Sequence, residues 1–367
     1  MDNTVDTALR MSDFDYDLPP ELIAQTPLEP RDASRLLIVN RATDTLAHRH
    51  FCDIGDYLQP GDLLIANQSR VIPARLLGRR AETGGAVEVL LLAERPDLGM
   101  DAWETLVRPG RRLREGTRMI FGDETAAHLA AEVLLRTDAG GRIVRFTVAG
   151  EEDERNVSRP YRVRELIDQL GQMPLPPYIH EKLADPERYQ TVYARISGSA
   201  AAPTAGLHFT PQLLEHLRQQ GVRVGFVTLH VGLDTFRPVE TDAVSEHKMH
   251  SEEIELDAPT AELINETRQA GRRVIAVGTT SVRVLESVAS IHGGRIAPYK
   301  GHTDLFITPG YRFQAVDAMI TNFHLPRSTL ILLVSSFAGK DLIKQVYDEA
   351  VRERYRFFSF GDAMLIL

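Results

Sequence analysis

The sequence predicts an α/β protein, in which a large α/β domain is interrupted by an inserted small β-barrel domain. Between residues 71 and 155, short apolar runs follow one another between turn residues, as in small barrels and sandwiches. From residue 156 onward, strand-like and helix-like patterns alternate, which is the order of an α/β layer. We therefore assign residues 11–70 and 156–367 to a discontinuous large α/β domain, 71–155 to the inserted barrel and 1–10 to an N-terminal extension.

The inserted segment consists of short strands. The sequence DAGG at 138–141 separates two strand-like runs, which is the pattern of a β-hairpin. The charged stretch GEEDERN at 150–156 ends the series. The expected strands are AVEVLLLAE, AWETLVRPG, TRMIFG, AEVLLRT and RIVRFTV.

The first helix of the α/β part has clear start and stop signals. Thr210 is a good N-cap, Pro211 suits the first helical position and Gly221 ends the helix. Leucines at 213, 214 and 217 place an apolar stripe on one face. The later strands are expected at VRVGFVTLHV, RRVIAVG and DAMLIL, and the later helices at TAELINETRQAG, TTSVRVLESVAS and KDLIKQVYDEAVRERY.

The composition is that of an ordinary globular protein, with 43% hydrophobic and 25% charged residues. The longest apolar run, STLILLVSSFAG, is too short to cross a bilayer and predicts a buried helix or strand. The first ten residues lack the basic start and apolar centre of a signal peptide. The single cysteine, Cys52, excludes an intrachain disulfide. We expect a cytoplasmic protein without membrane association.

The net charge of −9 argues against a nucleic-acid-binding protein. The basic residues are, however, mostly arginines, and they cluster at 70–80 and 108–118. Guanidinium groups suit phosphates because their N–H donors form a rigid fork. From composition alone, solvated surfaces of an arginine-rich chain remain the simpler explanation.

Two stretches of small residues are candidates for ligand contact. GSAAAPTAGLHFT at 198–210 lets backbone amides approach a flat or charged ligand, although tight packing of a buried loop explains it equally well. GTTS at 278–281 joins a strand to a helix and can bind an anion through free N–H groups, although Thr and Ser are also ordinary caps. Neither a dinucleotide-binding nor a P-loop fingerprint occurs.

Several titratable residues are further candidates. His208, His230, His250 and His324 lie among small and polar residues, and histidine transfers protons near neutral pH. A structural role is the default for any one of them. His247 and His250, three residues apart and followed by two glutamates, have a spacing that can hold a metal ion on a helix. Because no further ligand pair stands nearby, we expect no metal.

Two carboxylates occur in distinctive surroundings. The segment TDLFITPGYRF, which contains Asp304 and Tyr311, predicts a strand that enters a hairpin. Asp362 in FFSFGDAML suits a turn. Carboxylates and aromatic rings are also what a pocket for a cationic ligand needs.

Nine motifs, in order, closely resemble one family, the S-adenosylmethionine:tRNA ribosyltransferase-isomerases of queuosine biosynthesis. The resemblance extends from Met11 to the C-terminus. The motifs are SDFDYDLPPELIAQTPLEPRDASRLL, NQSRVIPARL, PLPPYI, YQTVYA, GSAAAPTAGLHFT, VTLHVGLDTFRPV, VGTTSVRVLES, TDLFITPGYRFQAVDAMITNFHLPRSTL and RYRFFSFGDAMLI.

This resemblance implies an unusual reaction. The family uses S-adenosylmethionine as a ribosyl donor, and it is a consumed co-substrate, so no cofactor is expected. The ribose is moved and rearranged onto the aminomethyl group of a deazaguanine base at the wobble position of tRNA. Adenine and methionine leave, and the product is epoxyqueuosine-tRNA. The implied fold is an α/β domain with an inserted β-barrel, and we expect a monomer.

The chemistry suggests roles for the motif residues. The sulfonium acidifies the adjacent ribose carbon, the departing adenine needs a proton, and the opened ribose needs its oxyanion stabilised. His208 and His230 are the leading acid/base candidates, and His324 is the third. The expected substrate-binding residues are Thr204, Ala205 and Gly206 for adenosine, Thr279, Thr280 and Ser281 with Arg283 for the methionine carboxylate, and Asp304 and Asp362 for a cation. The expected tRNA-binding residues are Arg75, Arg79, Arg80, Arg111, Arg112 and Arg114.

Two positions depart from the family pattern. Asp234 stands where the family usually has glycine, and Phe360 where tyrosine is commoner.

Three other functions stay open at this point. The first is an ordinary S-adenosylmethionine methyltransferase, although this sequence lacks the glycine-rich turn expected of that class. The second is a non-catalytic RNA-binding relative, which would bind RNA without turnover. The third is a metal hydrolase using His247 and His250, which would lose activity with a chelator.

Overall fold

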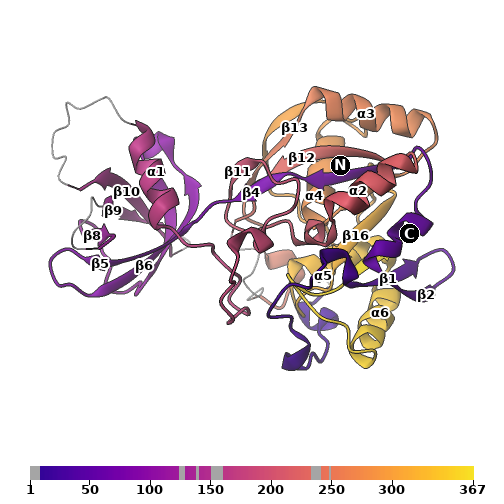
Figure 1. Cartoon of the computed structure of the whole chain (residues 1–367), viewed down its shortest axis with the longest axis horizontal. Helices are drawn as coiled ribbons and strands as arrows, with labels where there is room; N and C mark the ends of the chain where they lie inside the picture. Colours follow the sequence, from indigo (N-terminus) through magenta and orange to yellow (C-terminus); the bar gives the residue numbers. More distant parts are fainter. Residues whose placement is uncertain (1–8, 124–128, 138–139, 150–159, 233–240, 248) are drawn as a thin grey trace. The chain divides into compact units, whose positions relative to one another are not determined.

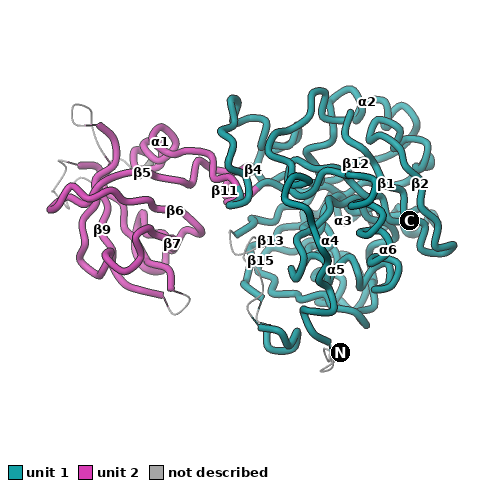
Figure 2. The backbone as a smooth tube through the Cα atoms, turned by 90° about the horizontal axis from the view of Figure 1, so that it is seen from below, with its two compact units in different colours: residues 1–70, 176–196, 202–367 teal, residues 71–175, 197–201 magenta. Residues whose placement is uncertain are grey.

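The chain forms a mixed α/β structure (Figure 1), which confirms the predicted fold class. In this computed structural model, the described residues fall into two compact units (Figure 2). The larger unit comprises residues 1–70, 176–196 and 202–367, and the smaller comprises 71–175 and 197–201. The structure describes residues 9–123, 129–137, 140–149, 160–232, 241–247 and 249–367.

The larger unit is built on a nine-stranded mixed sheet. Its central strands pair in parallel and are buried on both faces, as expected for strands covered by helices. The strand order is β15 (Tyr299–Thr303), β13 (Glu252–Leu256), β12 (Arg223–Leu229), β3 (Leu63–Asn67), β14 (Val274–Val277), β16 (Ala318–Asn322), β17 (Ala363–Ile366), β1 (Arg35–Asn40) and β2 (Thr45–His50).

Helices α2, α4 and α6 of this unit begin where the sequence predicts, whereas α3 begins at Ala258, two residues before the predicted segment. Helix α2 (Pro211–Gln219) is capped by Thr210, whose Oγ1 accepts a hydrogen bond from the Leu213 N–H at 3.1 Å. The segment with two predicted conformations, STLILLVSSFAG, forms a helix capped by Ser328. The other helices are α3 (Ala258–Gln269), α4 (Thr279–Ile291), α5 (Thr329–Ala338) and α6 (Lys340–Arg352), and α1 (Pro160–Leu170) lies in the smaller unit.

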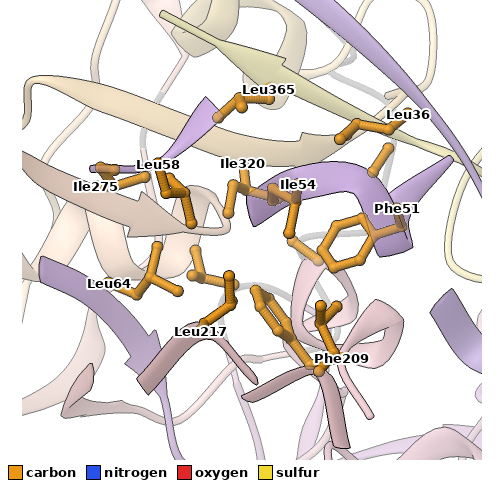
Figure 3. Close-up of a cluster of buried hydrophobic side chains, with 14 of the residues drawn as sticks. Leu36, Phe51, Ile54, Leu58, Leu64, Phe209, Leu217, Ile275, Ile320 and Leu365 are labelled. Atoms are coloured by element: carbon orange, nitrogen blue, oxygen red, sulfur yellow. The ribbon is translucent and has the colours of Figure 1, made fainter. Parts of the chain in front are cut away.

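One face of the sheet forms a large apolar cluster (Figure 3). Leu64, Ile275 and Ile320 project from neighbouring strands into this cluster. Phe51 and Leu217 cover them from a 3-10 helix and from α2. This cluster therefore packs β3, β14 and β16 against α2 and the 3-10 helix.

The smaller unit is a closed six-stranded antiparallel barrel. The predicted hairpin is confirmed, since β9 and β10 pair antiparallel around the Gly-rich turn. The barrel order is β10 (Arg142–Val148), β7 (Ala102–Arg108), β6 (Ala86–Glu94), β5 (Arg75–Arg80), β8 (Arg118–Phe121) and β9 (Leu129–Arg136). A separate two-stranded sheet pairs β11 (Ile196–Ser199) with β4 (Ser69–Val71).

Helix α1 belongs to the barrel unit, whereas the sequence assigned residues 156 onward to the larger domain. The reason is the apolar face of the helix. Val163, Leu166 and Ile167 are buried in the same cluster as the inward-facing side chains of the barrel strands. An amphipathic helix joins whichever apolar surface it covers, and here that surface is the barrel interior.

The segment 304–317 contains no strand, so the prediction of a strand entering a hairpin is wrong. Glu286 of α4 explains the irregular path. Its fully buried carboxylate accepts hydrogen bonds from the N–H groups of Gln314, Ala315 and Val316 at 2.8–3.1 Å, and one from the Tyr311 hydroxyl at 3.1 Å. These amides therefore point at a side chain and are unavailable for a β-ladder.

We predict that Glu286→Gln destabilises the larger unit by about 2–4 kcal/mol, because an amide nitrogen would face two of the four donors. Glu262→Gln on the exposed face of α3 is the matched control and should stay within about 0.5 kcal/mol of the parent. Urea unfolding of the two variants measures the difference. Equal stabilities would show that the carboxylate does not hold this segment.

Candidate active site

A pocket lies in the larger unit at the carboxyl ends of parallel strands. Gly278 directly follows β14, Thr321 and Asn322 end β16, and Val231 follows β12, and all four line the pocket. Open α/β sheets bind ligands outside the carboxyl ends of their strands, because loops with free polar groups converge there. Topology and pocket therefore indicate the same position for the functional site.

Asn322 forms the wall between this pocket and His208. Its amide Nδ2 donates to the Phe358 carbonyl at 3.2 Å and to His208 Nε2 at 3.1 Å. Its Oδ1 accepts from Thr204 Oγ1 at 3.2 Å. The side chain is 3% exposed. We call these four residues the Asn322 network.

The network determines the tautomer of His208. A carbonyl oxygen only accepts, so the Phe358 carbonyl identifies the amide nitrogen of Asn322. His208 Nε2 must then accept from that nitrogen, and the ring proton lies on Nδ1. Nδ1 donates to Ser34 Oγ at 2.7 Å. Both ring nitrogens of His208 are thus already hydrogen-bonded to the protein.

His208 is also shielded from the pocket. The imidazole stacks on Phe51, with ring centres 4.9 Å apart and an interplanar angle of 25°. Burial, with minor contributions from Arg356 and Arg31, lowers the pKa of His208 to about 3. A neutral, doubly hydrogen-bonded ring behind the wall supports Asn322 and is poorly placed to take a proton from a ligand.

His324 lines the pocket itself. Its Nε2 is hydrogen-bonded to Thr321 Oγ1 at 2.8 Å, and its backbone N–H donates to the Tyr347 hydroxyl at 2.9 Å. Its carbonyl accepts from the Tyr16 hydroxyl. Burial lowers the pKa of His324 to about 3, so the imidazole is neutral near neutral pH. Among the residues that the structure describes, the hydrogen bond found for this ring is the one at Nε2.

The alanine-rich loop contributes to both the pocket and the core. Thr204 and Ala205 line the pocket, and Ala205 also belongs to the apolar cluster of Figure 3. Gly206 does not line it. A Cβ at Gly206 would lie 2.0 Å from the Tyr193 hydroxyl and 2.8 Å from Thr191 Cγ2, so close packing alone requires glycine here. Tight packing therefore explains Gly206, whereas Thr204 and Ala205 lie at the surface of the pocket.

The N-terminus of α4 also opens onto the pocket. Gly278 precedes the helix with φ of 87°, and Thr279 and Thr280 line the pocket. The first N–H groups of an α-helix have no partner within the helix, and the helix dipole adds partial positive charge there. Thr280 Oγ1 is buried and has no hydrogen-bond partner among the described residues. Ser281 instead donates to the Val277 carbonyl at 2.8 Å, away from the pocket.

Four further predicted site residues also lie outside the pocket lining. Arg283 is buried in an ion pair with Glu252. The Asp362 carboxylate accepts from the backbone N–H groups of Arg35 and Arg356 at 2.9 and 2.8 Å, and burial raises its pKa. Asp304 is exposed. His230 is partly buried, which lowers its pKa, and it does not line the pocket.

The two departures from the family pattern have different outcomes. Asp234 lies outside the described residues. Phe360 is buried and packs edge-to-face against Tyr189, with ring centres 5.8 Å apart. An apolar ring suits that position.

Sequence reasoning missed Asn322, Thr321 and Phe358, all of which line the pocket. It also missed Tyr178, whose hydroxyl is hydrogen-bonded to Ser359 Oγ at 2.7 Å beside the same pocket. All lie within or next to quoted motifs. From those motifs only titratable residues and small residues of the two Gly-containing stretches were selected, and an amide or a backbone carbonyl gives neither signal.

The predicted tRNA-binding arginines all lie in the barrel unit. Arg75 is ion-paired with Glu88 at 2.8 Å, so its charge is locally compensated. Arg79 and Arg80 end β5, about 14 Å and about 17 Å farther along the strand than Arg75. The Ala81 N–H donates to the Arg118 carbonyl at 2.9 Å, which brings this end beside the start of β8. The remaining three, Arg111, Arg112 and Arg114, are exposed in the loop that precedes β8.

Two negative findings concern only the described part of the chain. It contains no group of three or more His, Cys, Asp and Glu side chains that could hold a metal ion. The segment around His247 forms a short 3-10 turn followed by a strand, so the helical metal site considered from the sequence is not formed. No helix there has the length and apolar character to span a membrane.

The chain is similar to proteins of one family. The model of a family described as queuosine biosynthesis protein matches residues 11–366. A relative from Symbiobacterium thermophilum, named S-adenosylmethionine:tRNA ribosyltransferase-isomerase, is 58% identical over 98% of this chain and 100% of its own. A relative of the same name from Moorella thermoacetica is 56% identical over 98% of this chain and 100% of its own. A crystal structure of an S-adenosylmethionine tRNA ribosyltransferase from Thermotoga maritima is 42% identical, covers 97% of this chain and 100% of its own, and gives a TM-score of 0.54.

The buried histidines predict a loss of stability in acid. The folded pKa of His324 is near 3, whereas that of an unfolded histidine is about 6.5. The unfolded chain therefore binds a proton that the native protein excludes, and stability falls as the pH drops from the unfolded pKa toward the folded one. Between about pH 7 and pH 5 the free energy of unfolding should fall more steeply in the parent than in His324→Asn, with a slope difference approaching about 1.4 kcal/mol per pH unit. Equal slopes in urea unfolding would show that His324 titrates normally.

Proposed function

The chain belongs to the queuosine biosynthesis protein family, and from this premise we propose that it is an S-adenosylmethionine:tRNA ribosyltransferase-isomerase. It transfers and isomerises the ribosyl group of S-adenosylmethionine onto the aminomethyl-deazaguanine wobble base of tRNA, and the products are epoxyqueuosine-tRNA, adenine and methionine. The observation that carries the proposal is identity of 58% to a relative of that name over nearly the whole chain.

The pocket suits S-adenosylmethionine in two respects. Ala202, Pro203 and Ala205 give it a small-residue wall against which a flat adenine ring can pack. The N-terminus of α4 offers free N–H groups and the Thr280 hydroxyl to a carboxylate. We therefore place adenosine against the alanine-rich loop and the methionine carboxylate at α4. Ser281, which donates to the Val277 carbonyl, and Arg283, which pairs with Glu252, lie outside the pocket.

His324 is our candidate for proton transfer. It is the predicted acid/base histidine that lines the pocket, and its neutral form can accept the proton from the ribose carbon next to the sulfonium. The imidazolium so formed, which burial makes a strong acid, can return that proton to the departing adenine. His208 acts through the Asn322 network and keeps Thr204 and the Phe358 carbonyl in place at the pocket wall.

The barrel unit is our candidate for tRNA contact. Exposed guanidinium groups at Arg111, Arg112 and Arg114 suit phosphates. Because the whole chain carries a net charge of −9, tRNA binding needs such a local concentration of positive charge, and it should weaken as salt rises. With tRNA as substrate and no cofactor, we expect the enzyme to act in the cytoplasm as a monomer.

Release of adenine and methionine, measured by liquid chromatography, tests both the function and the role of His324. The parent should release both from S-adenosylmethionine only when tRNA carries the aminomethyl-deazaguanine base. His324→Asn should lower kcat by about 10²–10⁴-fold, because general acid/base catalysis is lost. His216→Asn, an exposed position on α2, is the matched control and should retain parental activity.

Different results identify different errors. S-adenosylhomocysteine in place of adenine would show a methyltransferase, and tight tRNA binding without any product would show a non-catalytic relative. Adenine release at the parental rate in His324→Asn would keep the function but remove His324 from the proton transfer.

A further inference from the structure

Arg142 is a buried arginine of the barrel unit, and it belongs neither to the pocket nor to the arginines proposed to contact tRNA. It opens strand β10 and is 6% exposed. Its guanidinium donates to four backbone carbonyls: Nε to Leu113 at 2.8 Å, Nη1 to Gly140 at 3.0 Å and Gly141 at 2.8 Å, and Nη2 to Gly110 at 2.6 Å. Among the described residues, the hydrogen-bond partners of this guanidinium are all carbonyl oxygens.

Two of these carbonyls belong to the loop that follows β7. Gly110 and Leu113 bracket Arg111 and Arg112, and Leu113 is fully buried in the apolar cluster of the barrel. One residue later, the Arg114 N–H donates to Thr117 Oγ1 at 3.1 Å. The backbone is thus held on the inner side of the loop, while the side chains of Arg111, Arg112 and Arg114 are exposed.

The chemistry of arginine explains why this residue occupies the position. Carbonyl groups turned inward from a loop need donors, since an unpaired buried carbonyl costs free energy. A guanidinium has five N–H groups in one rigid plane and can serve several carbonyls at once. A lysine ammonium has three donors at a single point and cannot reach carbonyls on two separate loops.

We propose that Arg142 is a positioning residue for RNA binding, which holds loop 110–114 in the conformation that presents Arg111, Arg112 and Arg114 to phosphates. This inference rests on the proposed contact of these three arginines with tRNA. The three like charges repel one another and favour an open, variable loop. A loop that is ordered before binding loses less conformational entropy when it meets the RNA.

The test uses four full-length proteins in a double-mutant cycle: the parent, Arg142→Lys, the triple variant R111A/R112A/R114A, and the combination of both. The probe is tRNA carrying the aminomethyl-deazaguanine base, and its Kd is measured over a range of salt concentrations. Arg142→Lys should raise Kd about 5- to 10-fold and make the salt slope shallower by about 1, because phosphate contacts are lost. In the triple background the same substitution should change Kd less than about twofold, since its targets are gone.

Controls separate positioning from general damage. Arg145 lies on the same strand, is half-exposed, and its Nη2 is 3.8 Å from Glu132 Oε2. The variant Arg145→Lys should bind tRNA like the parent. The KM for S-adenosylmethionine should be unchanged in Arg142→Lys. Arg142→Gln, which keeps a planar donor, serves as the second variant if the lysine protein does not fold, and it should show the same cycle.

Two outcomes would overturn the inference. If the substitution at 142 weakens binding equally in the parent and triple backgrounds, Arg142 acts on the fold in general. If the triple variant binds tRNA like the parent, the loop does not contact RNA, and the proposal falls. Adenine release from the parent would still support the proposed function in either case, so the two failures are distinguishable.

Discussion

The active-site end of the larger unit depends on the side-chain amide of Asn322. An amide has two donor hydrogens and one acceptor oxygen, and here all three are used, by Thr204 and His208 of the alanine-rich loop and by Phe358 of the C-terminal loop. The hydrogens reach His208 and the Phe358 carbonyl, and the oxygen accepts from Thr204. Because Asn322 ends β16, the rigid sheet becomes the reference against which both the alanine-rich loop and the C-terminal loop are placed. A buried network in which each group has its partner fixes one arrangement.

This constraint separates two histidines that look alike in sequence. Burial keeps both rings neutral. Both ring nitrogens of His208 are hydrogen-bonded, one to Asn322 and one to Ser34. The neutral ring therefore holds Asn322 in place at the wall of the pocket. His324 lies two residues beyond Asn322, in the pocket lining, and the hydrogen bond found for its ring among the described residues is the one at Nε2. The proposed proton transfer by His324 and the support by Asn322 thus involve neighbouring positions at the end of β16.

Local sequence signals predicted the fold well where they act over a few residues. The Thr210 cap, the leucine stripe of α2 and the barrel hairpin are all local, and the structure confirms them. The segment 304–317 was mispredicted because its path is set by Glu286. This residue lies 28–30 residues before the amides that it binds, and no local pattern reveals such partners. Likewise Gly206 was grouped with ligand-binding residues, although the close approach of the Tyr193 side chain is what excludes a Cβ there. Asn322 was overlooked because its importance arises only when three distant segments of the chain meet.

The most direct test of this account is the protonation state of His208, observed by nitrogen NMR of protein labelled at the histidine rings and assigned with His208→Gln. The account predicts a neutral ring with the proton on Nδ1, unchanged on acidification to about pH 5, because its pKa lies far below that of a free histidine. A proton on Nε2 would mean that Asn322 presents its oxygen to His208. A ring that titrates near neutral pH would mean that the network is open to solvent, and either result would contradict the arrangement on which the proposed site depends.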